Sequence, residues 1–113
     1  LNLISSAAAD TIKGLLPVLD DCERAMEILE KSSDEAAKEG TSLIYTKLMD
    51  YLKTRGLAKI EAKGEDFNTD FHEAVTQFPA PSEDMKGKVI DVVQTGYMLN
   101  GKILRYAKVV VGA

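Results

Sequence analysis

The 113-residue sequence contains only one cysteine and one histidine, which excludes several kinds of site. Cys22 cannot form a disulfide within the chain, and a single cysteine fits a reducing compartment. Cys22 and His72 are far apart in the sequence, and they supply neither the four ligands of a zinc site nor the spacing of a Ser-His-Asp triad. We therefore expect no metal and no nucleophilic active site.

The sequence also lacks an excess of basic residues and a long apolar run. The formal net charge is -4, whereas nucleic-acid binders normally carry a basic footprint. No apolar run approaches the roughly 20 residues that a membrane span needs. No signal peptide is visible, and a start at Leu1 rather than Met indicates a fragment or a processed form. We expect a soluble, cytoplasmic protein, with neither nucleic acid nor membrane as a partner.

No cluster of residues has the arrangement of a catalytic site. The adjacent carboxylates of Asp20, Asp21 and Glu23 would point in different directions on a helix, which is poor geometry for general acid-base catalysis. The glycines are too scattered to form a phosphate-binding loop. His72 lacks partners and is interpreted as a structural or capping residue. We therefore expect a protein that is not an enzyme and needs no cofactor.

Residues 7–31 show the apolar period of a helix. One stripe recurs at steps of three and four residues, and it comprises Ile12, Leu15, Leu16, Leu19, Cys22, Met26 and Leu29. Pro17 lies inside this pattern, where a proline removes one helix hydrogen bond. Either the main helix begins near Leu16 or a longer helix bends at Pro17, and we favour the bend.

A second helix is predicted over residues 33–55. Ser32 and Glu35 have the spacing of a capping box, and Gly56 is a natural residue to follow the helix. Gly40 inside the helix costs about 1 kcal/mol relative to alanine, so we expect another helix to approach closely there. The predicted apolar face comprises Ile44, Leu48, Tyr51 and Leu52, with Leu43 and Met49 alongside.

Two helices joined by a short loop form an antiparallel hairpin, which cannot bury two apolar stripes by itself. The narrow stripe of the first helix favours contact with other helices, and a four-helix bundle made from two chains is the simplest solution. We therefore interpret residues 1–56 as a helical dimerisation region of a homodimer. Its predicted interface comprises Leu16, Leu19, Cys22, Met26, Leu29, Gly40, Ile44 and Leu48.

A tight turn at Asn100-Gly101 organises the C-terminal half. Asn-Gly between apolar runs is a strong hairpin signal, because a type I′ turn needs positive φ at both central residues. A two-residue loop also sets the register, and the predicted pairs are Leu99 with Lys102, Met98 with Ile103, and Tyr97 with Leu104. A third apolar strand then follows.

Residues 57–113 are predicted to form a small all-β domain, an antiparallel sheet or barrel. Further strands are expected at 57–62, 74–78 and 89–93, so the fold class is α+β. This part is locally basic, which is typical either of a solvated sheet face or of a patch for an acidic protein partner. The basic residues are Lys59, Lys63, Lys86, Lys88, Lys102, Arg105 and Lys108.

Two sequence blocks of this part are distinctive. The first runs from Phe67-Asn68 to His72-Glu73-Ala74-Val75, and the second, residues 96–111, contains Gly-Tyr-Met-Leu-Asn-Gly and, after Lys-Ile, Leu-Arg-Tyr-Ala. Together with the helix phrase at residues 15–21, they resemble the GrpE family, the nucleotide exchange factors of the DnaK chaperone. The resemblance extends over residues 15–111.

This resemblance implies a cytoplasmic bacterial homodimer, although a mitochondrial origin stays open. The family has a long paired helix, a four-helix bundle and a compact β-domain on each chain. Most of the long helix would be missing here, and it contributes to dimerisation, heat sensing and chaperone contact. The β-domain, residues 57–113, would dock on the nucleotide-binding domain of DnaK and open its cleft, so that ADP leaves without bond-making chemistry.

The resemblance also implies roles for individual residues. Val93 and Val111 match apolar chaperone contacts, although both are equally well interpreted as sheet core, and Lys102 matches a basic contact often filled by Arg. Gly40 matches a helix-packing position. Residues of the family's structural motif are Phe67, His72, Gly96, Tyr97, Asn100, Gly101 and Arg105. Two alternatives remain: a dimeric chaperone-binding adaptor without exchange activity, which Lys102 and Thr95 (where a basic residue is common) would favour, and a small enzyme.

Overall fold

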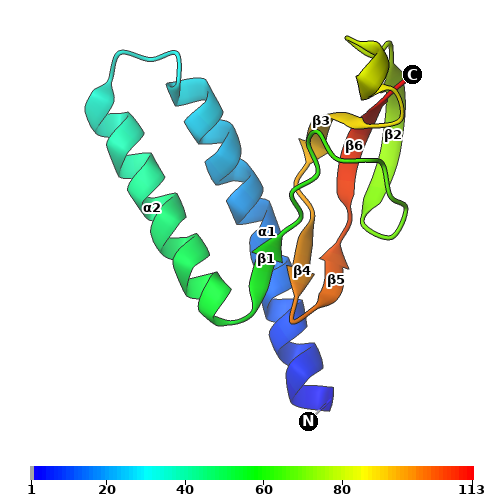
Figure 1. Ribbon diagram of the computed structural model, residues 1–113. Helices are drawn as coiled ribbons and strands as arrows, with labels where there is room; N and C mark the ends of the chain where they lie inside the picture. The colour runs from blue at the N-terminus through cyan, green and yellow to red at the C-terminus, as the bar shows by residue number, and fades with distance from the viewer. Residues whose placement is uncertain (1) are drawn as a thin grey trace. The chain divides into compact units, whose positions relative to one another are not determined.

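The computed structural model describes residues 2–113, and the chain divides after Gly56 into a helical unit and a β unit (Figure 1). The observed α+β class, with a helical hairpin followed by a small β unit, confirms the predicted one. In chain order the elements are α1 (Asn2–Leu29), α2 (Glu35–Thr54), β1 (Leu57–Lys59), β2 (His72–Phe78), the 3-10 turn η1 (Glu83–Met85), β3 (Val89–Gln94), β4 (Tyr97–Leu99), β5 (Lys102–Arg105) and β6 (Ala107–Gly112).

Helix α1 continues through Pro17, so the alternative in which the main helix begins near Leu16 is wrong. The predicted stripe is the side of α1 that faces inward: Ile12, Leu16 and Leu19 are buried. The other members of the stripe are half-buried, namely Leu15, Cys22, Met26 and Leu29. Over its described residues, neither helix is long and apolar enough to cross a membrane.

Asp34 caps the start of α2, which corrects the predicted capping box at Ser32 and Glu35. The Asp34 side chain accepts a hydrogen bond of 3.0 Å from the Ala37 backbone N–H. The Ser32 hydroxyl instead accepts from the Asp34 N–H at 3.0 Å, and so shapes the turn that precedes the helix. Aspartate is as good an N-cap as serine, and Asp34 stands directly before the first helical residue. At the other end Gly56 has φ 96° and donates to the Lys53 carbonyl at 3.0 Å, the expected C′ geometry.

The packed side of α2 differs from the predicted apolar face. Met49 and Leu52 are buried and Leu48 is half-buried, whereas Ile44 and Tyr51 are 65% and 61% exposed. The reason is geometric: α1 is the only helix beside α2 in the hairpin, and it covers one flank of a wider apolar surface. At Gly40 an added Cβ would meet nothing within 4 Å, so α1 does not make the predicted close approach.

The β unit contains two three-stranded sheets, with strand orders β1-β4-β5 and β2-β6-β3. The first sheet is antiparallel throughout, but β2 runs parallel to β6, so the prediction of one antiparallel sheet or barrel is wrong. The third apolar strand, β6, leaves the hairpin sheet at Tyr106 and becomes the centre of the second sheet. Strand β1 is also shorter than predicted, because the chain leaves the sheet after Lys59.

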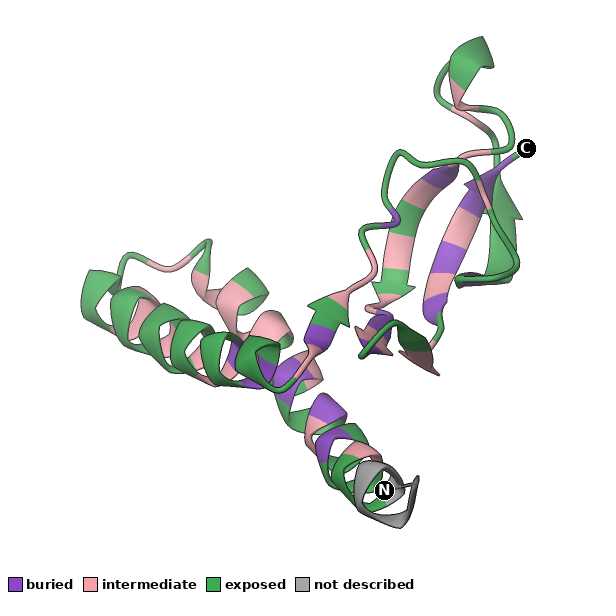
Figure 2. Ribbon diagram, turned by 60° about the horizontal axis from the view of Figure 1, so that its bottom comes forward, coloured by how far each residue is buried: buried purple, intermediate pink, exposed green. Residues whose placement is uncertain are grey.

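The core of the β unit lies between the second sheet and the loop that follows β1. Buried and half-buried residues alternate along β6 (Figure 2), as expected for a strand with one covered face. The buried residues of this core are Ala62, Val89, Ala107, Val109 and Val111, and Ile60, Phe67 and Val92 pack against them.

Candidate functional site

The tight turn between β4 and β5 has the predicted geometry. Asn100 and Gly101 have φ values of 50° and 81°, both positive as a type I′ turn requires. The pairs Leu99–Lys102 and Met98–Ile103 are confirmed. The turn therefore places the exposed cation of Lys102 at the first residue of β5, at the tip of the hairpin.

The third predicted pair of the hairpin is wrong, because Tyr97 faces Arg105 rather than Leu104. The register shifts between Tyr97 and Met98, as in a β-bulge, which re-aims the side chains beyond it. Arg105 donates two hydrogen bonds to the Thr95 carbonyl, from Nε at 3.1 Å and Nη2 at 2.6 Å. Its guanidinium also lies 5.5 Å from the ring centre of the buried Tyr97. Arg105 thus holds the start of the hairpin in place.

Gly96 lies where the chain passes against the start of β6. A Cβ at this position would stand 2.4 Å from the Ala107 nitrogen and 2.8 Å from its Cα. The Gly96 carbonyl accepts a hydrogen bond of 2.9 Å from the Ile60 N–H. Glycine is therefore required here by a close approach between backbones.

The three residues predicted to contact a partner do not occupy one place. Val93 is 62% exposed and lies at a register shift of β3, whereas Val111 is 6% exposed and belongs to the β core, where it pairs with Val89. Within the β unit, the β4–β5 turn that carries Lys102 and the C-terminal end of β6 lie at opposite ends (Figure 1). The side chains of Val93 and Lys102 are therefore accessible from outside the chain, whereas that of Val111 is almost fully buried.

The loop before β2 is held together around His72, which is 6% exposed. Its Nδ1 accepts a hydrogen bond of 3.0 Å from the Asn68 backbone N–H, and the Asn68 carbonyl accepts from the His72 N–H at 2.8 Å. The Phe67 ring lies 6.0 Å from the imidazole ring. His72 also begins the parallel pairing of β2 with β6, opposite Ala107. These contacts support the structural interpretation of His72.

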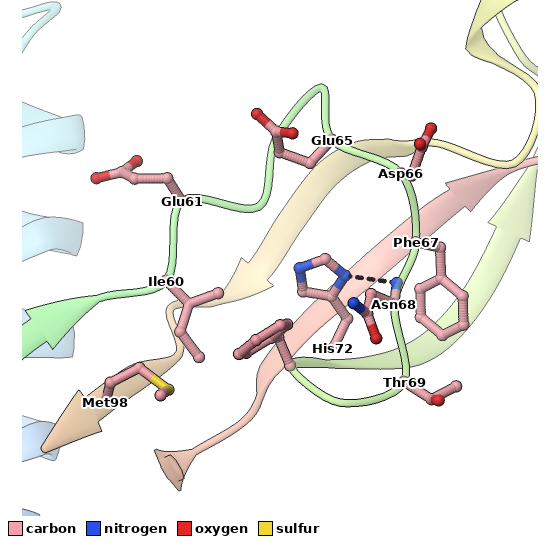
Figure 3. Close-up of a pocket in the computed structure, with 10 residues that line it drawn as sticks. Ile60, Glu61, Glu65, Asp66, Phe67, Asn68, Thr69, His72 and Met98 are labelled. Carbon is pink, nitrogen blue, oxygen red and sulfur yellow. Dashed lines mark hydrogen bonds between the residues drawn. The ribbon is translucent and has the colours of Figure 1, made fainter. Parts of the chain in front are cut away.

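A cavity of about 710 Å³ opens beside His72, and sequence reasoning did not identify it (Figure 3). The segments that line it come from the loop between β1 and β2, from the first residue of β2, and from β4. Its lining residues are Ile60, Glu61, Glu65, Asp66, Phe67, Asn68, Thr69, Phe71, His72 and Met98. The block at Phe67–His72 was the only sequence signal for this place, because the loop residues before it carry no motif and Met98 comes from a distant strand.

The acidic residues of this cavity do not converge with His72 on a common point. The carboxylates of Glu61, Glu65 and Asp66 point away from the imidazole ring (Figure 3), and Asp66 forms an ion pair of 3.2 Å with Lys88. Among residues 2–113 no group of three His, Cys, Asp or Glu side chains is arranged to hold a metal ion. Among these residues, the side chains that line the cavity do not form the paired acid and base of a hydrolytic site.

Burial lowers the pKa of His72 below the ordinary 6.5, and the Glu65 carboxylate opposes this effect. The unfolded chain therefore takes up a proton at His72 at a higher pH than the folded chain does. The part of the free energy of unfolding that depends on a neutral His72 is present above the unfolded pKa and is lost as the pH falls through the folded pKa. We expect the free energy of unfolding to be level above pH 7 and to decrease from about pH 6.5 downward. Urea denaturation at half-unit steps between pH 8 and pH 5 measures this.

The control for this pH dependence is His72→Asn, which keeps an acceptor near the Nδ1 position and cannot titrate. Because His72 is the single histidine and carboxylates titrate below about pH 5, the component between pH 7 and pH 5 should be absent from the variant. If the free energy of unfolding falls equally with pH in the wild-type chain and in His72→Asn, a group other than His72 causes the pH dependence.

The helical unit has its own candidate surface, on α2. Gly40, Ile44, Leu48 and Tyr51 share one side of the helix, at steps of three and four residues, and Ile44 and Tyr51 are largely exposed. Of the residues predicted for a dimer interface, Leu16 and Leu19 are already buried within the chain. Ile44 and Gly40 remain uncovered by it.

Comparisons with known proteins agree with the resemblance. The sequence model of the GrpE family matches residues 2–113. "Protein GrpE" of Bacteroides fragilis is 50% identical over 112 residues, which cover 98% of this chain and 57% of the relative. "Protein GrpE" of Porphyromonas gingivalis is 51% identical over 98% of this chain and 58% of the relative, and that of Francisella tularensis is 44% identical over 88% and 51%. The chain thus spans little more than half the length of these relatives.

Proposed function

This chain belongs to the GrpE family, and from that premise we propose that it acts as a nucleotide exchange factor for a DnaK-type chaperone. The observation that carries the proposal is the match over residues 2–113, together with a hairpin turn at Asn100 and Gly101 whose positive φ values are those of a type I′ turn. We place this activity in the bacterial cytoplasm, because the relatives are bacterial proteins.

The proposed mechanism is mechanical and needs neither a cofactor nor bond-making chemistry. The β unit docks on the nucleotide-binding domain of the chaperone and favours a conformation with an opened cleft, in which ADP loses contacts. Exchange factor and nucleotide then weaken each other's binding, and this coupling is reciprocal. A 100-fold mutual weakening corresponds to about 2.7 kcal/mol of coupling free energy.

Within the β unit, we assign the contact to Lys102 and Val93. Lys102 presents an exposed point charge at the hairpin tip, which suits a carboxylate of the partner. Val93 presents an exposed apolar side chain on β3. Val111 is left out of the proposed contact, because its side chain is buried in the β core.

We also propose that two copies associate through α2 and its neighbour α1 into a four-helix bundle. The support is the apolar side of α2 that comprises Gly40, Ile44, Leu48 and Tyr51, of which a single chain leaves Ile44 and Tyr51 largely exposed and Leu48 half-buried. Antiparallel helical hairpins commonly bury such faces against a second hairpin.

Lys102→Glu should reduce the exchange activity about tenfold or more, the equivalent of losing about 1.4 kcal/mol of contact free energy. The charge reversal opposes a carboxylate on the partner, whereas the exposed position of Lys102 makes the fold insensitive to it. The measurement is release of a fluorescent ADP analogue from a DnaK nucleotide-binding domain, titrated with this chain in excess unlabelled nucleotide.

Lys63→Glu, the same charge reversal at another exposed site of the β unit, is the matched control and should leave the rate unchanged. An equal loss in both variants would indicate a long-range charge effect without a contact at Lys102. Binding of the wild-type chain without any acceleration would refute exchange activity and leave a chaperone-binding adaptor.

A further inference from the structure

The cavity beside His72 contains a hydrogen-bond donor that the protein itself does not use. Because Nδ1 accepts a hydrogen bond from the Asn68 N–H, the proton of the neutral imidazole is on Nε2. Nε2 has no hydrogen-bond partner among residues 2–113. Figure 3 shows it on the side of the ring away from Asn68, toward Ile60, which also lines the cavity. A histidine with only 6% exposure thus directs a free N–H into this space.

The walls around this donor are apolar. Ile60 and Met98 line the cavity on the side of Nε2 (Figure 3), and Phe71 is a further lining residue. Phe71 is 38% exposed, and its ring lies 6.4 Å from the imidazole ring. Aromatic, branched and thioether side chains around a single polar group are typical of a site that takes one apolar side chain and fixes its orientation by a hydrogen bond.

The rim of the cavity is acidic. Glu61 and Glu65 are exposed, and neither carboxylate has an ion-pair partner in the described part of the chain. Asp66 adds a third carboxylate, which Lys88 partly neutralises. This charge repels phosphates, nucleic acid and other anions, and it attracts a cation placed beside the apolar group.

We propose that this cavity binds an extended segment of another protein, in which an apolar side chain stands next to a lysine or arginine. The apolar side chain lies between Ile60, Phe71 and Met98, a backbone carbonyl of the segment accepts from His72 Nε2–H, and the basic side chain faces Glu61 and Glu65. A peptide offers an acceptor at every residue, so it can meet the donor while its side chains meet the wall and the rim. This site is separate from the contact assigned to Lys102 and Val93.

The test uses the full chain and two probe peptides, acetyl-Leu-Arg-Leu-Arg-amide and acetyl-Leu-Glu-Leu-Glu-amide, followed by NMR. We expect the basic peptide to shift the methyl signals of Ile60 and Met98 and the His72 Nε2 signal saturably, and the acidic peptide to shift none of them. His72→Asn, which keeps the acceptor for Asn68 and removes the Nε2 donor, should weaken binding about tenfold.

Glu61→Gln/Glu65→Gln is the second variant, and because both side chains are exposed its fold is not at risk. It should weaken binding of the basic peptide at least threefold. Glu73→Gln, at an exposed site on β2 outside the cavity, should leave this binding unchanged. Equal binding of both peptides, or no saturable shift up to millimolar peptide, would overturn the proposal. So would cavity shifts that grow with protein concentration alone, since these would assign the cavity to a second copy of the chain.

Discussion

Gly96→Ala is expected to lower the free energy of unfolding of the β unit by about 3 kcal/mol, at the upper end of what overpacking costs. The new methyl group would stand 2.4 Å from the Ala107 nitrogen and 2.9 Å from the Ala107 Cβ. These atoms cannot rotate away as the end of a flexible side chain would, because Ala107 starts the central strand β6 and is itself buried. Relief of the clash would move β6 and disturb its pairing with both β2 and β3. Urea denaturation followed through the NMR signals of the β6 valines reports this loss.

Gly14→Ala provides the matched control in the helical unit. Gly14 lies inside α1, and a Cβ there would meet nothing within 4 Å. The same substitution should therefore stabilise the protein by up to about 1 kcal/mol, through the better helix propensity of alanine. If the two variants lost similar stability, the backbone contact at Ala107 would not explain the requirement for glycine at position 96.

Local features of the β unit could be predicted from the sequence, whereas features that depend on contacts between distant residues could not. The turn at Asn100-Gly101 was predictable, because the conformation of a two-residue loop depends on the residues in it. The bulge between Tyr97 and Met98 was not, because the two turn residues do not determine the register further along the hairpin, where Arg105 faces Tyr97 and donates to the Thr95 carbonyl. The place of β6 in the second sheet was equally unpredictable, since pairing of β6 with β2 joins segments that are distant in sequence.

The helices show the same division between local and long-range information. Periodicity correctly identified the stripe on α1, but on α2 it merged two sides of the helix into one face. Met49 and Leu52 face inward, while Ile44 and Tyr51 remain exposed. Helical periodicity shows on which side of a helix the apolar residues lie, but it does not show which part of that side is covered by a neighbouring element.

The candidate contact residues were predicted mainly from the resemblance to the family, and only in part from the chemistry of the residues themselves. Lys102 could be placed at a hairpin tip from turn chemistry, whereas only the structure shows that Val93 is exposed and that Val111 is buried in the core. The cavity beside His72 could not be predicted, because Ile60 and Met98 come from separate strands and loops. The unused Nε2 donor became visible only once the partner of Nδ1 was known.

The exposed side of α2 leads to the second large effect: Ile44→Glu should raise the dissociation constant of the proposed dimer at least about 100-fold, or 2.7 kcal/mol. In the single chain Ile44 is 65% exposed, so a glutamate there remains hydrated and the hairpin keeps its stability. In a four-helix bundle the same carboxylate would be removed from water opposite apolar side chains, and an unpaired buried charge costs several kcal/mol. The substitution thus separates association from folding.

Thr46→Glu is the control, because Thr46 is exposed on the opposite side of α2 and the added charge is the same. Sedimentation equilibrium over a range of concentrations should show a dimer for the wild-type chain and for Thr46→Glu, and a monomer of unchanged helical content for Ile44→Glu. A wild-type chain that stays monomeric at high concentration, or an Ile44→Glu variant that still dimerises, would show that this side of α2 is not the interface. In the latter case the half-buried residues of α1, Cys22, Met26 and Leu29, would be the next place to introduce a charge.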